Sequence, residues 1–342
     1  MKIALLSYPM LFQREGGLQI QIRRTASELE ALGVTARIFE PTKEKLEDYD
    51  IVHVFSAMNG TYRIIEHAKS IGRKAIISPV LQPMPPRFEK QRAKLGAFLS
   101  LALTSYRYNT LYNQIFSALD LSDRIIALSE TEAQTAVKLY DQSPAKISII
   151  PNGVSEGFFQ ADASLFMQEH PVASPFVLMV GTISDYKNQL TVIRATESEG
   201  YPIVMIGQAD ASDYLDRCLE TGGERVTYCG TLANDDPLLA SAYAAASVLA
   251  IPSRGESAPL SALESLAAGT PVVITNNHGL GLRPKEPLFS AVEPYDTAEI
   301  LAKIKQAINT ETKPDTCRDL VRRYSWSHVA AELKAVYQEL LQ

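Results

Sequence analysis

Two carboxylates late in the chain, Glu256 and Glu264, are spaced so that both can act on one ligand. They lie in PSRGESAPLSALESLAAGTPVVIT (252–275), where Pro259 pre-sets the backbone for a helix that Gly269 ends. A carboxylate accepts hydrogen bonds from two hydroxyl groups of a ribose or hexose, and burying it without such partners is costly. Spacing alone leaves open that Glu256 only complements the helix dipole and that Glu264 is a surface residue.

The start of the same helix is suited to an anion. The backbone N–H groups of Ser257, Ala258 and Leu260 lie at its expected N-terminus, where the helix dipole favours negative charge. Pro259 has no N–H and contributes only shape. The segment therefore combines an expected anion site with two carboxylates.

A lysine, Lys187, follows an earlier strand in GTISDYKNQL (181–190). The order is strand, glycine turn and helix, so Lys187 can meet a diphosphate as a point charge near the helix start. By itself this signal is weak, because any exposed lysine fits it.

Two glycines, Gly16 and Gly17, come after the first expected strand in REGGLQIQ (14–21) and directly before a helix. Paired glycines at this place allow the backbone to approach a phosphate or a sugar closely. The segment lacks the full G-x-G-x-x-G pattern, so a dinucleotide site is not indicated. The open alternative is a flexible turn.

Short apolar segments rich in β-branched residues alternate with helical patterns along the whole chain. The expected strands are 2–7, 34–39, 50–55, 74–78, 123–128 and 146–150, followed by 176–181, 202–207, 225–230, 247–252 and 271–275. Strands of this length separated by helices predict parallel sheets wound by right-handed crossovers. The predicted fold class is α/β, with two Rossmann-like, doubly wound domains facing a central cleft and ligands at the carboxyl ends of the strands.

The boundary between the domains is expected at about 155–175, where neither the strand period nor the helix period is present. We therefore predict a first domain at 1–160, a linker, and a second domain at 170–324. The closing segment, 325–342, is an amphipathic helix that follows the last expected strand. We expect it to pack back on the first domain.

The composition, 46% apolar and 21% charged, is that of a folded globular protein. The three cysteines and five histidines are scattered without zinc or redox spacing, so we expect no metal and no cofactor. No apolar stretch approaches the roughly 20 residues that span a bilayer, and MKIALLSYPM is more typical of a buried strand than of a secretory signal. These features predict a cytoplasmic protein.

Basic residues gather in 63–107, which holds nine Lys and Arg against two Glu, although the chain carries a net charge of −6. In RFEKQRAKLGAFLSLAL (87–103), basic residues precede an apolar run that begins at Phe98 and Leu99. This arrangement suits a helix at the inner face of an anionic membrane, or a contact with a charged acceptor. In the alternative, the apolar run packs inside the first domain and the charges are solvated.

Five segments, in the same order along the chain, resemble the retaining glycosyltransferases of family 4, which have the GT-B fold. The family's E-x7-E motif is matched by ESAPLSALE, with AAGTPVV as its usual continuation, and the other similar segments are SDRIIALSE (122–130) with KISIIPNGV (146–154), GTISDYKN (181–188) and the closing YSW helix. The resemblance covers nearly the whole chain. It implies an enzyme that binds a nucleotide sugar.

The resemblance also implies roles for individual residues. Lys187 binds the donor diphosphate, Glu264 the ribose hydroxyls and Glu256 the transferred sugar, so that Lys187 and Glu256 are the expected catalytic residues. The other residues implied to contact the donor are Gly16, Gly17, Thr182, Gly207, Leu232, Ser257, Ala258 and Leu260.

By the same resemblance, a hexose is transferred with retention to a polysaccharide or lipid-linked saccharide, with a UDP-sugar favoured as donor and UDP-glucose first. No metal and no nucleic acid are expected. One rival interpretation is a sugar-nucleotide epimerase of the same fold, although its acid/base cluster is not evident. Another is a non-catalytic member that binds sugar nucleotides.

The chain departs from the family pattern at three places. Thr182 stands where many members have arginine, Ser257-Ala258-Pro259 replaces a glycine-rich sequence, and ISPVLQP (77–83) lacks a frequent histidine. Lys187 is therefore expected to supply more of the charge. Gln82 is the candidate substitute for the histidine.

Overall fold

The computed structural model describes residues 1–13, 16–82, 87–104, 110–210 and 212–342, without the side chains of 87–90, 101–104 and 212. Of the segments singled out above, 14–15, 83–86 and 105–107 lie outside the described residues. The contacts divide the chain into two compact units. Unit 1 comprises Met1–Asn152, Gly279–Gly281 and Trp326–Gln342, and unit 2 comprises Gly153–His278 and Leu282–Ser325.

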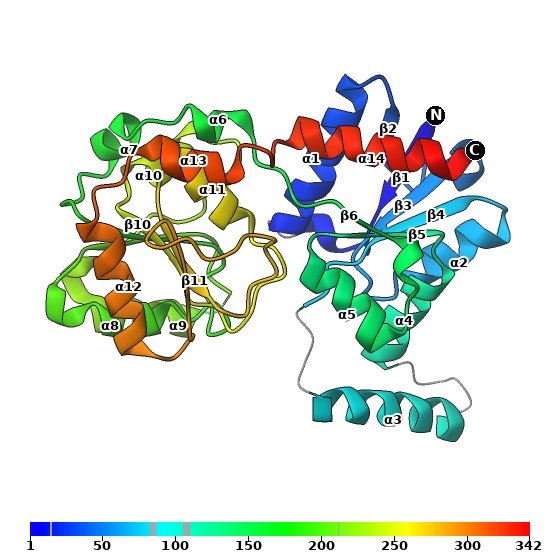
Figure 1. Ribbon diagram of the computed structural model, residues 1–342, viewed down its shortest axis with the longest axis horizontal. Coiled ribbons are helices and arrows are strands. Elements are labelled where there is room, and N and C mark those ends of the chain that lie inside the picture. The colour runs from blue at the N-terminus through cyan, green and yellow to red at the C-terminus, as the bar shows by residue number, and fades with distance from the viewer. Residues whose placement is uncertain (14–15, 83–86, 105–109, 211) are drawn as a thin grey trace. The chain divides into compact units, whose positions relative to one another are not determined.

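Unit 1 is built on a six-stranded parallel sheet in the order β2-β1-β3-β4-β5-β6 (Figure 1). The strands are β1 Lys2–Leu6, β2 Thr35–Ile38, β3 Ile51–Phe55, β4 Lys74–Ser78, β5 Arg124–Ala127 and β6 Ile147–Ile149. Each lies within a segment whose apolar, β-branched pattern predicts a strand. Because all the neighbours are parallel, the carboxyl ends of these strands lie at one edge of the sheet.

Helices cover both faces of this sheet, α1 and α14 on one and α2, α4 and α5 on the other (Figure 1). The helices of unit 1 are α1 Gly17–Ala31, α2 Tyr62–Ser70, α3 Arg87–Thr104, α4 Leu111–Leu121, α5 Glu130–Tyr140 and α14 Trp326–Leu341. Two of these helices have an N-terminus that is capped by a side chain. The hydroxyl of Thr110 accepts from Asn113 N at α4, and that of Ser129 accepts from Glu132 N at α5.

Unit 2 contains a second six-stranded parallel sheet, in the order β12-β11-β10-β7-β8-β9. Its strands are β7 Val177–Val180, β8 Ile203–Ile206, β9 Val226–Tyr228, β10 Val248–Ile251, β11 Val272–Thr275 and β12 Phe289–Val292. Strand β12 was not predicted from the sequence. Its four residues include Ser290 and Ala291, so its apolar signal is weak.

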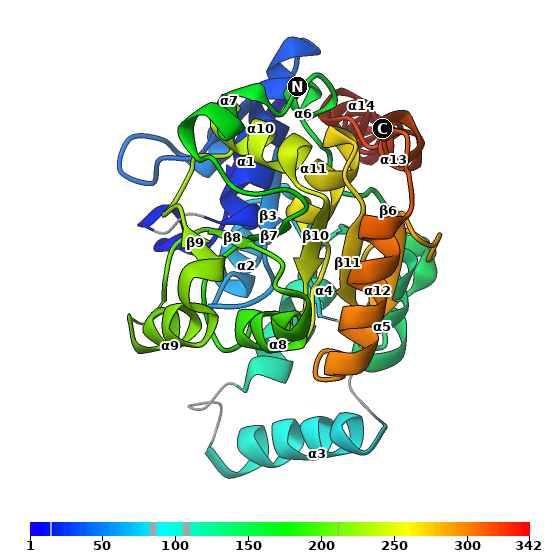
Figure 2. The same ribbon diagram turned by 90° about the vertical axis from the view of Figure 1, so that its left-hand side faces the viewer.

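The longer helices of unit 2 lie on opposite faces of the sheet, with α8, α9 and α12 on one and α10, α11 and α13 on the other (Figure 2). Their bounds are α8 Gln189–Ala195, α9 Ser212–Gly222, α10 Pro237–Ala245, α11 Leu260–Ala268, α12 Thr297–Asn309 and α13 Pro314–Val321. Each sheet is therefore doubly wound, as the alternation of strands and helices predicts.

The segment at 155–175 is part of unit 2 and not the linker that its irregular pattern suggests. It forms two short helices, α6 Glu156–Phe159 and α7 Ser164–Glu169, which bury Phe158 and Phe166. The hydroxyl of Ser241 on α10 accepts from the N–H of Phe166 at 2.9 Å and donates to the carbonyl of Asp162 at 2.7 Å. Short helices held by tertiary contacts carry no period long enough to be detected in a sequence.

Three basic residues of the segment 63–107 form ion pairs in its described part. Arg63 pairs with Glu66, Lys69 with Asp123 and Lys94 with Asp141. Its apolar residues behave differently, because α3 exposes 60% of Leu95, 68% of Phe98 and 44% of Leu99. Phe98 and Leu99 therefore do not pack inside unit 1, whereas Leu101 and Leu103 have side chains outside the described part.

The closing helix α14 is attached to the sheet of unit 1 by a buried polar network. The Tyr337 hydroxyl lies 2.7 Å from Nδ1 of His53 on β3, and Nε2 of His53 lies 2.9 Å from the Ser78 hydroxyl on β4. Burial lowers the pKa of His53 to about 3, so the imidazole is neutral and has one donor and one acceptor. Two hydroxyl groups, each able to donate or accept, satisfy both ring nitrogens.

We predict that Tyr337→Phe lowers the free energy of unfolding of unit 1 by about 1–3 kcal/mol, because Nδ1 of His53 loses its partner in a buried place. The change in the free energy of unfolding is measured by urea unfolding, which is monitored through the fluorescence of Trp326, the only tryptophan of the chain. Tyr8→Phe serves as the control in the same unit, since Tyr8 is partly exposed whereas Tyr337 is fully buried. Equal midpoints for both variants would contradict the network.

Candidate functional site

The carboxyl edge of the second sheet is closely packed at three glycines, Gly181, Gly207 and Gly230, which follow β7, β8 and β9. The N–H of Gly181 donates to Ile206 O at 2.9 Å, and that of Gly207 donates to Gly230 O at 2.7 Å. A side chain at Gly207, where φ is 146°, would place its Cβ 2.0 Å from the carbonyl oxygen of Gly181. Glycine is therefore required at Gly207 by the close approach of two backbone segments.

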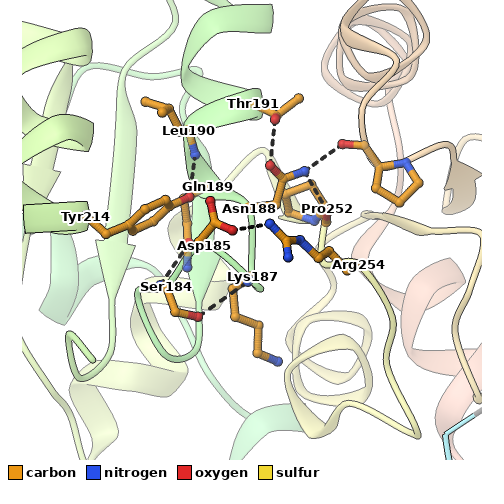
Figure 3. Close-up of polar contacts among 11 residues, drawn as sticks. Ser184, Asp185, Lys187, Asn188, Gln189, Leu190, Thr191, Tyr214, Pro252 and Arg254 are labelled. Carbon is orange, nitrogen blue, oxygen red and sulfur yellow. Dashed lines mark hydrogen bonds and ion pairs between the residues drawn. The ribbon is translucent and has the colours of Figure 1, made fainter. Parts of the chain in front are cut away.

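The turn after β7 is fixed to two other loops through Asn188 (Figure 3). Asn188 has a left-handed backbone, with φ of 61°, and its side-chain amide donates to Pro252 O at 3.0 Å and to Pro294 O at 2.7 Å. The N–H of Lys187 donates to Ser184 O at 3.0 Å. The turns that follow β7, β10 and β12 are thereby held together, and Lys187 lies just before α8 in a defined place.

Lys187 and Glu256 form an ion pair, with 2.7 Å between Nζ and Oε1. Glu256 is 8% exposed, whereas the Lys187 side chain remains 29% exposed. The backbone of Glu256 is fixed as well, because its N–H donates to Asn277 O at 2.9 Å. Two residues that are 69 positions apart therefore place a cation and an anion side by side at this edge of the sheet.

Further contacts tie the same two loops together. Arg254 pairs with Asp185, and the hydroxyl of Tyr186 donates to Gly255 O at 3.0 Å (Figure 3 shows the Arg254 pair). A Cβ at Gly255 would lie 2.7 Å from Nδ2 of Asn277, so this position accepts only glycine without rearrangement. These contacts reduce the freedom of the loop that carries Glu256.

Helix α11 begins at Leu260, after Pro259, and ends at Gly269, whose φ of 97° is left-handed. Ser257 and Ala258 lie in the loop immediately before it, at the helix end where the dipole favours an anion. Glu264 is 5% exposed and in the second turn of the helix. The alternative in which Glu264 is a surface residue is therefore wrong.

Two residues that the sequence did not single out hold the carboxylate of Glu264. Oε1 accepts from Nδ2 of Asn234 at 2.6 Å, and Oε2 accepts from the hydroxyl of Tyr243 at 2.9 Å. Tyr243 is fully buried on α10, and burial together with the Glu264 charge raises its pKa well above the ordinary value. Asn234 sits in a polar loop and Tyr243 in an apolar helix, so neither pattern signals a carboxylate partner.

The remaining candidates are dispersed. Thr182 lies in the turn after β7, where its carbonyl accepts from Nε2 of Gln189 at 2.9 Å, and Leu232 lies in the loop after β9. Gly16 and Gly17 belong to unit 1, at the start of α1. Gly16 has extended backbone, and a Cβ there would meet nothing within 4 Å, so packing among the described residues does not demand glycine.

Metal-binding side chains do not gather in the described part of the chain, where no group of three His, Cys, Asp or Glu residues could hold an ion. The sequence contains one Asp-x-Asp, Asp48-Tyr49-Asp50, directly before β3. The carboxylate of Asp50 accepts from Lys2 N at 2.7 Å. This motif therefore lies at the amino edge of the first sheet, opposite the edge at which doubly wound folds bind ligands.

A third buried carboxylate, Glu132 in unit 1, was also missed. It is 3% exposed, and its two oxygens accept from Leu81 N and Leu128 N, each at 2.6 Å. In the sequence Glu132 is one of two acids just after Ser129, and acids ordinarily lie in water. Glu132 instead joins the loop after β4 to the start of α5.

Residues 174–310 match the family model of the glycosyl transferases group 1. Among curated proteins, the D-inositol 3-phosphate glycosyltransferase of Mycolicibacterium vanbaalenii is 30% identical over 245 residues, which cover 64% of this chain and 53% of that protein. The chain spans about half the length of the curated relatives it matches first.

Solved structures resemble the chain over nearly its whole length. Sucrose-phosphate synthase from Thermosynechococcus elongatus has a TM-score of 0.77 at 19% identity, over 99% of both chains. Anabaena HepE in complex with UDP-glucose has a TM-score of 0.71 at 16% identity, over 99% of this chain and 100% of that one. The chain thus has the GT-B fold of glycosyltransferases. Its second unit contains a glycosyl transferases group 1 domain.

Glu132 should make the stability of unit 1 depend on pH. Burial raises the pKa of its carboxyl from 4.5 to about 7, while backbone N–H groups oppose the shift. Between these values the folded state binds more protons than the unfolded state, so the free energy of unfolding decreases as pH rises through this range and is level above it. At about 1.4 kcal/mol per pKa unit, the decrease is at most about 3.5 kcal/mol.

The measurement is urea unfolding at pH 5 and pH 8, followed by Trp326 fluorescence, for the wild type and Glu132→Gln. We expect the wild type to lose stability relative to the variant as the pH rises, because glutamine does not titrate. A difference between the two proteins that is the same at both pH values would show that Glu132 does not titrate in this range.

Proposed function

We propose that the chain is a retaining glycosyltransferase that moves a hexose from a nucleotide sugar, with UDP-glucose as the first candidate, to a saccharide or lipid-linked acceptor. The main observation in support is the ion pair between Lys187 and Glu256 at the carboxyl edge of the second sheet. The pair lies inside the segment that matches the glycosyltransferase domain, and ligands of doubly wound folds bind at this edge. A cation for a diphosphate and an acceptor for sugar hydroxyls stand next to each other there.

The chemistry to be assisted is departure of a nucleoside diphosphate from an anomeric carbon. Negative charge grows on the leaving phosphate, and Lys187 together with the N–H groups at the start of α11 would stabilise it. Because Lys187 already contacts Glu256, a diphosphate that reaches the lysine brings the sugar within range of the carboxylate. The proposal includes no catalytic metal and assigns no general base.

The donor is proposed to be a UDP-sugar because HepE, which shares the fold, binds UDP-glucose. Transfer is favoured over epimerisation by the named relatives, which are glycosyltransferases. The direct test incubates the protein with a panel of radiolabelled nucleotide sugars and saccharide acceptors and measures product with its anomeric configuration. Inverted product would reject retention, and absence of both transfer and donor binding would reject the function.

We predict that Lys187→Ala lowers kcat of transfer by about 100-fold or more, because it removes a charge partner of the leaving phosphate. Lys187→Arg should retain more activity, since it keeps the charge and the pairing with Glu256. Lys305→Ala, which breaks the surface pair with Glu199, is the control and should leave the rate unchanged. Turnover of Lys187→Ala close to that of the wild type would show that the lysine does not act on the phosphate.

The two carboxylates should differ in the ligands that they affect. Glu264→Gln should weaken binding of UDP, because Glu264 is proposed to accept the ribose hydroxyls. Glu256→Gln should weaken only the UDP-sugar, since it removes the sugar contact but leaves Lys187 available to the diphosphate. Calorimetry with UDP and UDP-glucose separates the two roles, and equal losses for both ligands in both variants would refute them.

A peripheral contact of unit 1 with an anionic membrane is part of the proposal. The exposed Leu95, Phe98 and Leu99 of α3 support it, because neighbouring large apolar side chains in water favour shallow insertion. The basic residues of the same helix would lie at the headgroups. None of the described helices is long and apolar enough to cross a membrane.

We expect sedimentation with anionic vesicles at low salt, and none with neutral vesicles. A Phe98→Ser/Leu99→Ser variant should lose binding by losing the insertion, and a variant with Arg87, Lys90, Arg92 and Lys94 changed to Glu should lose it by losing about 1 kcal/mol per basic residue. Leu111→Ser, an exposed apolar residue on α4, is the control. Wild-type binding by both α3 variants would contradict the contact.

A further inference from the structure

Tyr243 on α10 is a fully buried tyrosine whose position is fixed from two sides. Its ring meets that of Phe158 on α6 edge to face, with 5.8 Å between the centroids. Its carbonyl accepts from the hydroxyl of Thr270, just after the end of α11, at 2.6 Å. The Tyr243 hydroxyl therefore donates to the carboxylate of Glu264, at 2.9 Å, from a well-packed part of unit 2.

Asn234 approaches the same carboxylate from a different element, the loop between β9 and α10. The chain turns tightly before the helix, where the N–H of Asp236 donates to Ala233 O at 3.1 Å and the Asp236 carboxylate accepts from Leu238 N at 2.9 Å. Asn234 is half-buried within this turn, and its amide donates to Oε1 of Glu264 at 2.6 Å. The turn that caps α10 thus also directs a donor at Glu264.

The two donors bind different oxygens of Glu264 and so fix the direction of its carboxylate. The last torsion of a glutamate side chain has broad wells, so a single hydrogen bond would leave the carboxylate able to turn. Bonds to both oxygens, from side chains on two elements, remove that freedom. A carboxylate offers about four acceptor positions, so accepting from both side chains is compatible with accepting from the hydroxyl groups of a ligand.

Folding alone gives little reason for this arrangement. Glu264 and Tyr243 are 5% and 0% exposed, and a pair of apolar side chains of the same shape could fill the same space at little or no cost in stability. A buried carboxylate that is held from two sides, by residues which themselves are fixed, has the features of a preorganised binding group. The arrangement therefore indicates a ligand that needs the carboxylate in one direction.

We propose that Asn234 and Tyr243 are positioning residues, which direct the Glu264 carboxylate so that the protein selects a ribonucleoside diphosphate over its 2′-deoxy counterpart. The inference rests on the proposed function, in which Glu264 accepts the ribose hydroxyls. A carboxylate held in place for a hydroxyl group loses that partner when the ligand lacks it, and binding of the deoxy ligand is weakened. A carboxylate able to turn accepts from water instead and discriminates less.

The experiment measures the Kd of UDP and of 2′-deoxy-UDP by calorimetry for the wild type, Tyr243→Phe, Asn234→Ala and Glu264→Gln. We expect the wild type to bind UDP about 10- to 100-fold more tightly than 2′-deoxy-UDP, the range of a hydrogen bond to a charged group. In Tyr243→Phe and in Asn234→Ala this ratio should fall by about threefold or more, as expected for groups that act on one contact. The Kd of 2′-deoxy-UDP should change by less than the Kd of UDP.

The ratio of the two dissociation constants separates positioning from general damage, because a variant with a weakened fold binds both ligands less well and keeps the ratio. Tyr214→Phe is the matched control and should keep the wild-type ratio. It removes the hydroxyl of another buried tyrosine of unit 2, one that accepts from Leu190 N at 3.1 Å (Figure 3). Adding Tyr243→Phe to Glu264→Gln should lower the ratio no further, since both changes act through one carboxylate.

A wild-type ratio in Tyr243→Phe or in Asn234→Ala would overturn the inference for that residue, and so would equal losses of affinity for both ligands. Asn234→Ala changes a half-buried loop residue, so it keeps the test decisive if Tyr243→Phe fails to fold. A ratio lost only in Glu264→Gln would overturn this inference and leave the proposed function intact. A wild type with neither UDP binding nor transfer would overturn both.

Discussion

The structure depends on one constraint, which is that the strands of each sheet all run in the same direction. Parallel strands need crossover helices and bring every carboxyl end to one edge of the sheet. In unit 2 this edge brings the turn with Lys187 next to a distant part of the chain, the loop with Glu256 that leads into α11. The close glycines at Gly181 and Gly207 allow the turns to pack there without side chains between them.

Among the described residues, three carboxylates are buried at these edges, and each is stabilised by a different kind of partner. Glu256 has the ammonium group of Lys187, Glu264 has the side chains of Asn234 and Tyr243, and Glu132 has backbone N–H groups. A buried carboxylate without partners would destabilise the fold, so each of these three carboxylates needs its contacts to be tolerated in the interior. Each contact also fixes the direction of the carboxylate, which a ligand-binding group requires.

The sequence predicted most of the fold because strand formation in a parallel sheet depends on a local property, a short apolar run buried on both faces. Eleven of the expected segments contain the strands β1 to β11. The local signal is weak at β12, and at 155–175 short helices form only through tertiary contacts, so neither was predicted. In both places packing decides the structure, as the hydrogen bonds of Ser241 with Asp162 and Phe166 illustrate.

The sequence by itself determined two doubly wound units, the positions of Lys187 and Glu256 in turns that follow strands, and the position of Glu264 inside a helix, because these follow from local periodicity. It left open whether Glu264 is exposed, and it did not indicate that Lys187 meets Glu256, since residues 69 apart in the chain have no local signal of contact. It also gave no sign of Asn234, Tyr243 or Glu132 as parts of the sites. Only the tertiary structure decided these, because burial and pairing of charges depend on which loops the parallel sheets bring together.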